Sequence, residues 1–216
     1  MGLVIAVDGP GGAGKGTICR IVSKEFGYAY LDTGLLYRAV AAKLIECGGE
    51  VTKDKAVTFA SAFNIDDLGV ATLRAPNVSE LASEIAIIPE VRDKLLNFQI
   101  NFSKDPRGAI LDGRDIGVKV CPTADLKIFL TASLEVRAKR RWVDLKVINP
   151  EENFEIVKEK LRKRDQRDIN RALSPLIKAE DALLIDTSEL TIDASVEVFV
   201  KAIKDILKKN AKKLKQ

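Results

Sequence analysis

Apolar and polar positions follow two different patterns along this chain. Short runs of four to six nearly continuous hydrophobic residues are separated by longer stretches in which apolar residues recur at helical spacing. Short continuous runs are typical of strands in a parallel sheet that helices cover on both faces. The pattern predicts strands at Leu3–Asp8, Tyr28–Leu31, Ala109–Asp112, Leu126–Leu130 and Leu183–Asp186.

The longer stretches predict helices. They fall at Lys15–Phe26, Gly34–Glu46, Ser133–Val147, Glu151–Arg171 and Asp193–Lys209. Pro150 fits the start of the fourth helix, because the first N–H groups of a helix have no partner inside it. Strands that alternate with helices predict an α/β fold of three layers, in which a five-stranded parallel sheet lies between helices.

Between Cys47 and Pro106 the alternation of strands and helices breaks. This stretch is longer than a single crossover and looks mainly helical, with Pro89 separating two helices. Its position between the second and third strands suits a substrate-specific subdomain and a plain structural elaboration equally. We therefore predict one domain over residues 1–216, with a core at 1–47 and 106–216 and an insertion at about 48–105.

The composition indicates a core that needs neither metal nor disulfides, since 46% of the residues are hydrophobic. The chain has no histidine, which excludes histidine bases and histidine metal ligands. Cys19, Cys47 and Cys121 lie far apart and form no CxxC pair, as expected of reduced thiols. No run is long enough to span a membrane and no signal peptide is recognisable, so we predict a cytoplasmic protein.

The net charge of +4 arises from the C-terminal segment. Residues 201–216 carry seven lysines and one aspartate, which leaves the rest of the chain at −2. Apolar residues such as Phe199, Val200 and Ile203 recur at helical spacing, so the segment is predicted to be the solvated end of a helix. Nucleic-acid binding is the minor alternative. No feature indicates a subunit interface, and we expect a monomer.

A glycine-rich loop follows the first predicted strand and fulfils Gly-x-x-x-x-Gly-Lys, the phosphate-binding pattern. Small residues let successive backbone N–H groups point at an anion, and the helix that begins at Lys15 adds its positive end. Lys15 supplies a charge to the outer phosphates. The motif predicts a P-loop NTPase fold that binds ATP through Gly9, Gly11, Gly12, Ala13, Gly14, Lys15, Gly16 and Thr17.

Magnesium is the cofactor expected with ATP. Asp112 ends the third predicted strand beside the loop, where a carboxylate can orient Mg²⁺ through its water shell. A capping role at the strand end is the alternative for Asp112. Gly16 stands where the loop motif usually has Ser or Thr, so the following Thr17 is the second candidate contact to the metal.

Arginines near predicted strand ends suit a reaction that brings two anionic nucleotides together, because a guanidinium holds phosphate through paired hydrogen bonds. Arg38 and Arg114 lie at such positions, and more arginines follow in residues 162–171. A mixed-charge run of this kind is also typical of a solvated helix face. The residues alone favour that second interpretation for 162–171.

Several strings resemble those of the bacterial cytidylate kinases, members of the P-loop nucleoside monophosphate kinase superfamily. Asp-Gly-Arg-Asp at 112–115 and Arg-Asp-x-Arg-Asp-x-Asn-Arg at 164–171 are the most specific, and the likeness also covers 8–17, 31–38 and 181–187. The resemblance implies transfer of the terminal phosphoryl group of ATP to CMP or dCMP, in pyrimidine metabolism. It also implies an acceptor-binding role for the insertion and a short lid at about 141–151.

The resemblance implies roles for individual residues. It makes Lys15, Arg38, Arg114 and Arg171 the catalytic set, the three arginines gripping the acceptor phosphate. Arg164 and Asp168 would contact the ribose. The remaining CMP contacts would be Thr33, Tyr37, Ser83, Arg92 and Asp115, of which the last three read cytosine.

Near the expected lid, Arg140 is assigned to ATP. Its neighbours Arg137 and Arg141 suit a triphosphate contact and a basic helix surface equally. Phe63–Asn77 is too short for the strand-rich insert of bacterial members.

Two alternatives remain open at this point. One is a kinase of another small acceptor, such as UMP. The other is a nucleotide-dependent regulatory or RNA-associated protein that uses the loop as a switch. A kinase makes ADP only with the right monophosphate, whereas a switch hydrolyses or retains nucleotide without an acceptor.

Overall fold

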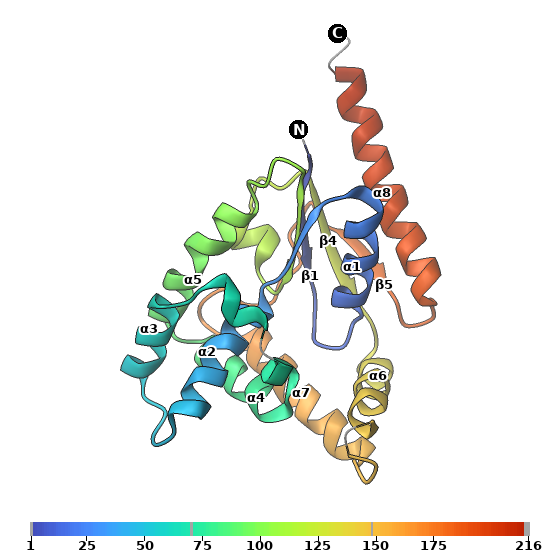
Figure 1. The fold of residues 1–216 in the computed structure, drawn as a ribbon. Coiled ribbons are helices and arrows are strands. Elements are labelled where there is room, and N and C mark those ends of the chain that lie inside the picture. The colour runs from blue at the N-terminus through green and yellow to red at the C-terminus, as the bar shows by residue number, and fades with distance from the viewer. Residues whose placement is uncertain (1, 70, 148, 214–216) are drawn as a thin grey trace.

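The computed structural model describes residues 2–69, 71–147 and 149–213, and it contains the predicted parallel sheet (Figure 1). The strand order is β2-β3-β1-β4-β5, and every neighbouring pair is parallel. The predicted strands are confirmed, with their ends within one residue. They are β1 (Val4–Asp8), β2 (Ala29–Asp32), β3 (Ala109–Gly113), β4 (Leu126–Thr131) and β5 (Leu183–Asp186).

The five helices predicted in the core are present as α1 (Lys15–Phe26), α2 (Gly34–Cys47), α6 (Leu134–Lys146), α7 (Phe154–Asn170) and α8 (Ile192–Lys213). The predicted start of the fourth was wrong. That helix, α7, begins at Phe154, because Asn153 caps it by accepting from Ile156 N at 3.2 Å. Pro150 belongs to the preceding turn. Helix α8 continues to Lys213, beyond the predicted end at Lys209.

Two helical layers cover the sheet, and the alternation of side chains along β1 divides the core between them. Ile5 and Val7 point to the layer formed by α1 and α8, which pack against each other. Ala6 points to the other layer, which contains α2. The α1–α8 layer is closed by Phe199 and Ile203, both fully buried.

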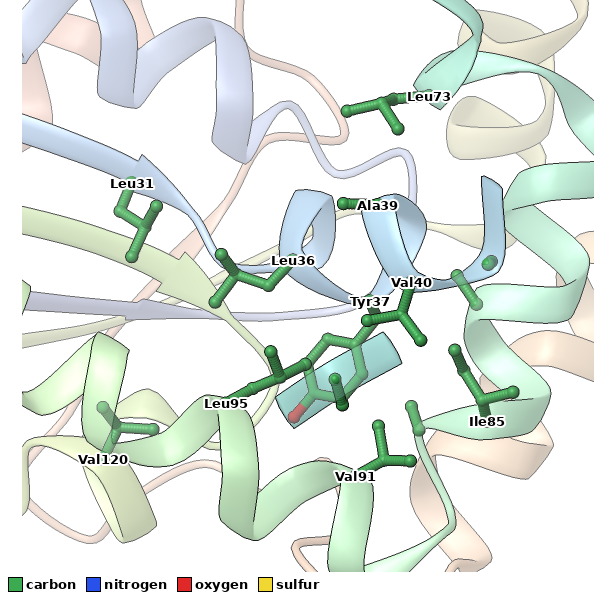
Figure 2. Close-up of a cluster of buried hydrophobic side chains, with 14 of the residues drawn as sticks. Leu31, Leu36, Tyr37, Ala39, Val40, Leu73, Ile85, Val91, Leu95 and Val120 are labelled. Atoms are coloured by element: carbon green, nitrogen blue, oxygen red, sulfur yellow. The ribbon is translucent and has the colours of Figure 1, made fainter. Parts of the chain in front are cut away.

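The insertion is helical in its described residues and packs on α2. It comprises α3 (Lys53–Ser61), the 3₁₀ turns η1 (Ile65–Gly69) and η2 (Ala71–Arg74), α4 (Pro76–Ile85) and α5 (Pro89–Phe102). Pro89 does separate two helices, since it is the first residue of α5. Figure 2 shows the cluster that joins α2 to the insertion, in which the Tyr37 ring lies close to Val91 and Leu95.

All five strands end at the same edge of the sheet, since they are parallel. The segments that follow them therefore gather there, and ligands of open α/β sheets bind at this edge. Gly9 follows β1, Thr33 follows β2, Arg114 and Asp115 follow β3, and Thr187 follows β5. Separately, none of the helices within the described ranges is long and apolar enough to cross a membrane.

Candidate active site

The loop between β1 and α1 has the geometry of a phosphate cradle. Gly12 and Gly14 have φ values of 77° and 92°, which favour glycine and turn the backbone around the start of α1. The Lys15 ammonium lies inside this turn and donates to Gly9 O at 2.8 Å and Pro10 O at 3.1 Å. Burial and the nearby Arg114 lower the pKa of Lys15 to about 8. An anion bound here would favour the charged form of the amine.

A cavity of about 470 Å³ lies between this loop, α2, the insertion helices and α7. It brings together nearly all the residues predicted from the sequence. The predicted residues that line it are Gly11, Gly12, Ala13, Gly14, Lys15, Gly16, Thr17, Thr33, Tyr37, Arg38, Ser83, Arg92, Asp112, Arg114, Asp115, Arg140, Arg164, Asp168 and Arg171.

Gly9 is the predicted residue that lies outside the cavity wall. Its φ is +147°, and a Cβ at this position would lie 1.9 Å from Leu130 O on β4. Only glycine fits there, so Gly9 sets the path of the loop against the sheet and offers its carbonyl to Lys15.

The cavity carries an excess of positive charge. Ten basic and five acidic side chains line it. Burial lowers the pKa of Arg38, and burial together with Arg114 lowers the pKa of Arg164 to about 10. A lowered guanidinium pKa means that the surrounding carboxylates do not fully compensate the charge. The side chains that line the cavity within the described residues therefore favour the binding of anions.

One edge of the cavity is fixed by an ion pair between β3 and α7. Arg114 Nε donates to Asp168 Oδ2 at 2.8 Å, and Arg114 Nη1 donates to Gly113 O at 3.0 Å. Burial alone would raise the pKa of Asp168, but Arg114 and Arg164 outweigh it and hold that pKa below its ordinary value. The pair orients the Arg114 fork while leaving donors of the same group for a ligand.

The three residues assigned to cytosine lie at another edge. Arg92 donates to Asp115, and the Arg92 guanidinium lies 5.6 Å from the centre of the Tyr37 ring. Arg171 Nη2 lies 3.9 Å from Asp115 Oδ1 and has no hydrogen bond within the described residues. Ser83 Oγ is also buried without a protein partner there. Buried polar groups without a partner at one wall indicate a site for a polar ligand.

Asp112 lies at the floor of the cavity beneath the loop. Its carboxylate accepts from the Tyr30 hydroxyl at 2.6 Å, and its backbone O accepts from Thr33 Oγ1 at 2.8 Å. Burial and the neighbouring Asp32 raise the pKa of Asp112 to about 7. The Thr33 hydroxyl thus donates its hydrogen to strand β3. Toward a ligand, the same hydroxyl can act only as a hydrogen-bond acceptor.

The structure separates two arginines of α6 that the sequence left undecided. Arg137 is buried and donates to Ala132 O, to Gly11 O and to Asp165 Oδ2, at 2.8, 3.1 and 2.5 Å. Its guanidinium is therefore used to fasten α6 and α7 to the loop. Arg141 lines the cavity instead.

Sequence reasoning missed several residues of the cavity wall. Asp32 ends β2 beside Asp112, and its position at a strand end was a usable signal. Arg74 in η2 belongs to no motif, so nothing in the sequence pointed to it. The wall also includes Arg20, Asp144, Thr187, Leu190, Ile192 and Ser195.

A five-stranded parallel sheet, a glycine-lysine loop at its carboxyl edge and an arginine-rich cavity facing that loop define the class of P-loop kinases that act on small phosphorylated acceptors. Within that class, the chain belongs to the cytidylate kinase family, since the family model described as cytidylate kinase matches residues 5–205.

Curated relatives agree with this assignment over nearly the whole chain. Cytidylate kinase of Cereibacter sphaeroides is 46% identical over 203 residues, which cover 94% of this chain and 96% of the relative. Cytidylate kinase of Methylocella silvestris is 43% identical over 210 residues, covering 95% and 97%. Among solved structures, an uncharacterized protein from Eubacterium ventriosum has a TM-score of 0.57 at 11% identity, with 94% and 98% coverage, and shares the fold.

Proposed function

We propose that this chain is a cytidylate kinase that transfers the terminal phosphoryl group of ATP to CMP or dCMP, giving ADP and CDP or dCDP. One observation carries the proposal. A single cavity joins the phosphate loop to Asp115, which sits between Arg92 and Arg171. Asp115 offers a carboxylate to the exocyclic amine of cytosine, while Arg92 donates to the ring nitrogen and carbonyl. Uracil lacks that amine and would place a carbonyl oxygen, another acceptor, against the buried carboxylate, which is costly.

The proposed reaction is an in-line phosphoryl transfer. An oxygen of the acceptor phosphate attacks the terminal phosphorus of ATP, and the new P–O bond forms as the bond to the bridging oxygen of ADP breaks. Such a transfer requires positioning and charge compensation from the protein. Backbone N–H groups of the loop and Lys15 hold the donor phosphates, while Arg38, Arg114 and Arg171 neutralise charge on the acceptor side.

The ribose of the acceptor is assigned to Arg164 and Asp168, which lie one helical turn apart on α7 and share the cavity with Arg114. The ring of the ATP base is assigned to the wall beyond the loop, where Ile18, Leu190 and Ile192 provide apolar surface. Apolar side chains with a few polar groups are typical of nucleotide pockets.

The residues present fit a magnesium ion bound together with ATP. Mg²⁺ is usually held by one or two carboxylates and the substrate phosphates, and the cavity wall offers Asp112, Asp32 and the Thr17 hydroxyl. The Tyr30 hydroxyl occupies Oδ2 of Asp112, which leaves Oδ1 for water or metal. When bound, the ion would supply further charge neutralisation at the phosphates.

The proposal gives roles to parts of the chain as well. Residues at about 48–105 would bind the acceptor, and about 141–151 would form a short lid that excludes water. Free thiols at Cys19, Cys47 and Cys121 support a reducing compartment, in keeping with a cytoplasmic enzyme of pyrimidine metabolism. We propose a monomer, for which analytical ultracentrifugation is the check.

A panel of acceptors tests the function. Purified protein is mixed with ATP, Mg²⁺ and one of CMP, dCMP, UMP or AMP, and release of ADP is followed. We expect ADP in proportion to added CMP or dCMP, little with UMP and none with AMP. Preference for UMP would instead indicate the second acceptor class. ADP released at the same rate without any acceptor would indicate a switch and would overturn the proposal.

A further inference from the structure

Thr187 stands directly after β5 and joins three parts of the active site. It is 1% exposed, and its N–H donates to Thr131 O at 2.8 Å. Its hydroxyl lies 3.2 Å from Ala13 O in the phosphate loop and 3.0 Å from Thr131 O. Arg140 of α6 donates to it twice, from Nη1 to the hydroxyl at 3.0 Å and from Nη2 to the carbonyl at 2.7 Å.

The single hydrogen of the hydroxyl can serve only one of the two carbonyls at a time. Thr131 O already accepts from the Thr187 N–H, so it stays satisfied without the hydroxyl. Ala13 O lies in the loop that precedes α1, and the hydroxyl is its side-chain donor within the described residues. The Thr187 hydroxyl can therefore donate its hydrogen to Ala13 O and hold the loop in place, while its oxygen accepts the hydrogen bond from Arg140.

The way in which Arg140 is held differs from that of its neighbours. Arg114 and Arg137 are oriented by the carboxylates of Asp168 and Asp165, which compensate their charge. Thr187 orients Arg140 through two neutral oxygens, and Arg140 takes part in no ion pair within the described residues. Its guanidinium reaches the loop, since a Cβ at Gly14 would lie 3.9 Å from Nη1. The Arg140 guanidinium is thus held in one orientation, and its positive charge is not neutralised by a carboxylate.

We propose that Thr187 is a positioning residue for the donor nucleotide, which holds the Arg140 guanidinium against the phosphate loop and steadies the loop at Ala13. The inference rests on the proposed function and extends it to a residue outside the loop motif and the arginine strings. Its physical basis is that a fixed, uncompensated cation stabilises triphosphate more than a mobile or paired one.

Isothermal titration of the full-length protein with Mg²⁺ and ATP, without acceptor, tests this directly. Thr187→Val removes the hydroxyl at equal volume and is expected to weaken ATP binding about tenfold, as for loss of a charge-assisted hydrogen bond. Thr187→Ser keeps the hydroxyl and should stay within about threefold of the wild type. Ser188→Ala is the matched control, because Ser188 binds Ser133 N and not Arg140 or Ala13, and should leave ATP affinity unchanged.

A double-mutant cycle with Arg140→Met separates positioning from a general structural effect. If Thr187 acts through Arg140, Thr187→Val should weaken ATP binding less than about threefold in the Arg140→Met background. An equal factor in both backgrounds, or equal losses of ATP and CMP affinity, would overturn the proposal. Thermal unfolding confirms that each variant is folded, and Thr187→Ala replaces Thr187→Val in the cycle if the valine variant does not fold. Because ATP binding is read without acceptor, the result is independent of whether CMP is phosphorylated.

Discussion

The phenolic hydroxyl of Tyr30 donates a 2.6 Å hydrogen bond to Oδ2 of Asp112, across the neighbouring strands β2 and β3. Burial and Asp32 raise the pKa of Asp112 to about 7, while Lys15 and this hydrogen bond work in the opposite direction. Tyr30 therefore favours the ionised form of the carboxylate proposed to orient Mg²⁺. Tyr30 lies outside every motif discussed for the sequence.

Replacement Tyr30→Phe should raise the pKa of Asp112 further, because the ionised carboxylate loses a donor. At pH 7 a smaller fraction of Asp112 would then be ionised, and turnover should fall about fivefold for a rise of one pKa unit and require more Mg²⁺. The loss should shrink at pH 9, where the carboxylate is ionised in both proteins. The check is the acidic limb of the pH–rate profile, which must move to higher pH. If the acidic limb of the pH–rate profile did not move, the assignment of Asp112 to the metal site would be wrong.

Asp112→Asn should make the protein more stable at pH 8 and less active. The folded-state pKa of Asp112, about 7, lies above its ordinary value of 3.8. Between pH 3.8 and 7, therefore, Asp112 is protonated in the folded protein and ionised in the unfolded chain. The contribution of Asp112 to the free energy of unfolding is therefore most favourable at low pH and declines as pH rises from about 4 to 7. Asparagine carries no charge to bury. Thermal unfolding at pH 8 should show a rise of about 2–4 °C for each kcal/mol regained.

The pair between Arg114 and Asp168 gives the opposite pH dependence. The folded-state pKa of Asp168 is held below the ordinary value, so its stabilisation is present above about pH 4 and is lost as pH falls through the folded-state pKa. Asp168→Ala should lower the free energy of unfolding by about 3 kcal/mol at pH 7, since it leaves Arg114 buried without its partner.

The control for this variant is Asp181→Asn, which breaks the pair that the largely exposed carboxylate of Asp181 forms with Lys127. Denaturant unfolding at pH 7 should show only a small loss of stability for it, well below that of Asp168→Ala. A loss for Asp168→Ala that stayed undiminished at pH 3 would contradict an electrostatic origin.

Asp115→Ala should damage use of the acceptor and spare ATP binding. The substitution removes the carboxylate that pairs with Arg92 and lies 3.9 Å from Arg171, at the edge of the cavity proposed to bind the acceptor. We expect kcat/KM for CMP to fall by about two orders of magnitude or more, and the affinity for ATP to change less than about threefold. Steady-state kinetics with each substrate varied in turn measures both. Equal losses would show that Asp115 does not read the acceptor.

Two glycines with positive φ should respond differently to alanine. At Gly9 a Cβ would lie 1.9 Å from Leu130 O, so Gly9→Ala must displace the phosphate loop or β4 and should abolish ATP binding. At Gly27, with φ +68°, a Cβ meets nothing within 4 Å, and Gly27→Ala should cost only about 1 kcal/mol and leave ATP binding intact. Titration with ATP and thermal unfolding of both variants provide the comparison.

Local sequence determined most of the secondary structure here. The strand ends and the helix at Lys15 could be predicted because hydrophobic period and the glycine loop are properties of short segments. The start of α7 was missed, since proline and asparagine both suit the beginning of a helix. Asn153 lies four residues before Val157, which is a buried residue of α7. This spacing favoured the later start of the helix, at Phe154.

The tertiary structure decided how those segments meet. Arg137 and Arg140 are alike in the sequence and lie on one helix, yet one is bound to Asp165 and the other to Thr187. Tyr30 reaches Asp112 across 82 positions, and Arg140 reaches Thr187 across 47. Such contacts depend on strand order and helix packing, which sum many weak interactions over the whole chain. No short window of sequence contains that information, so the partners of these side chains emerge only when the sheet is assembled.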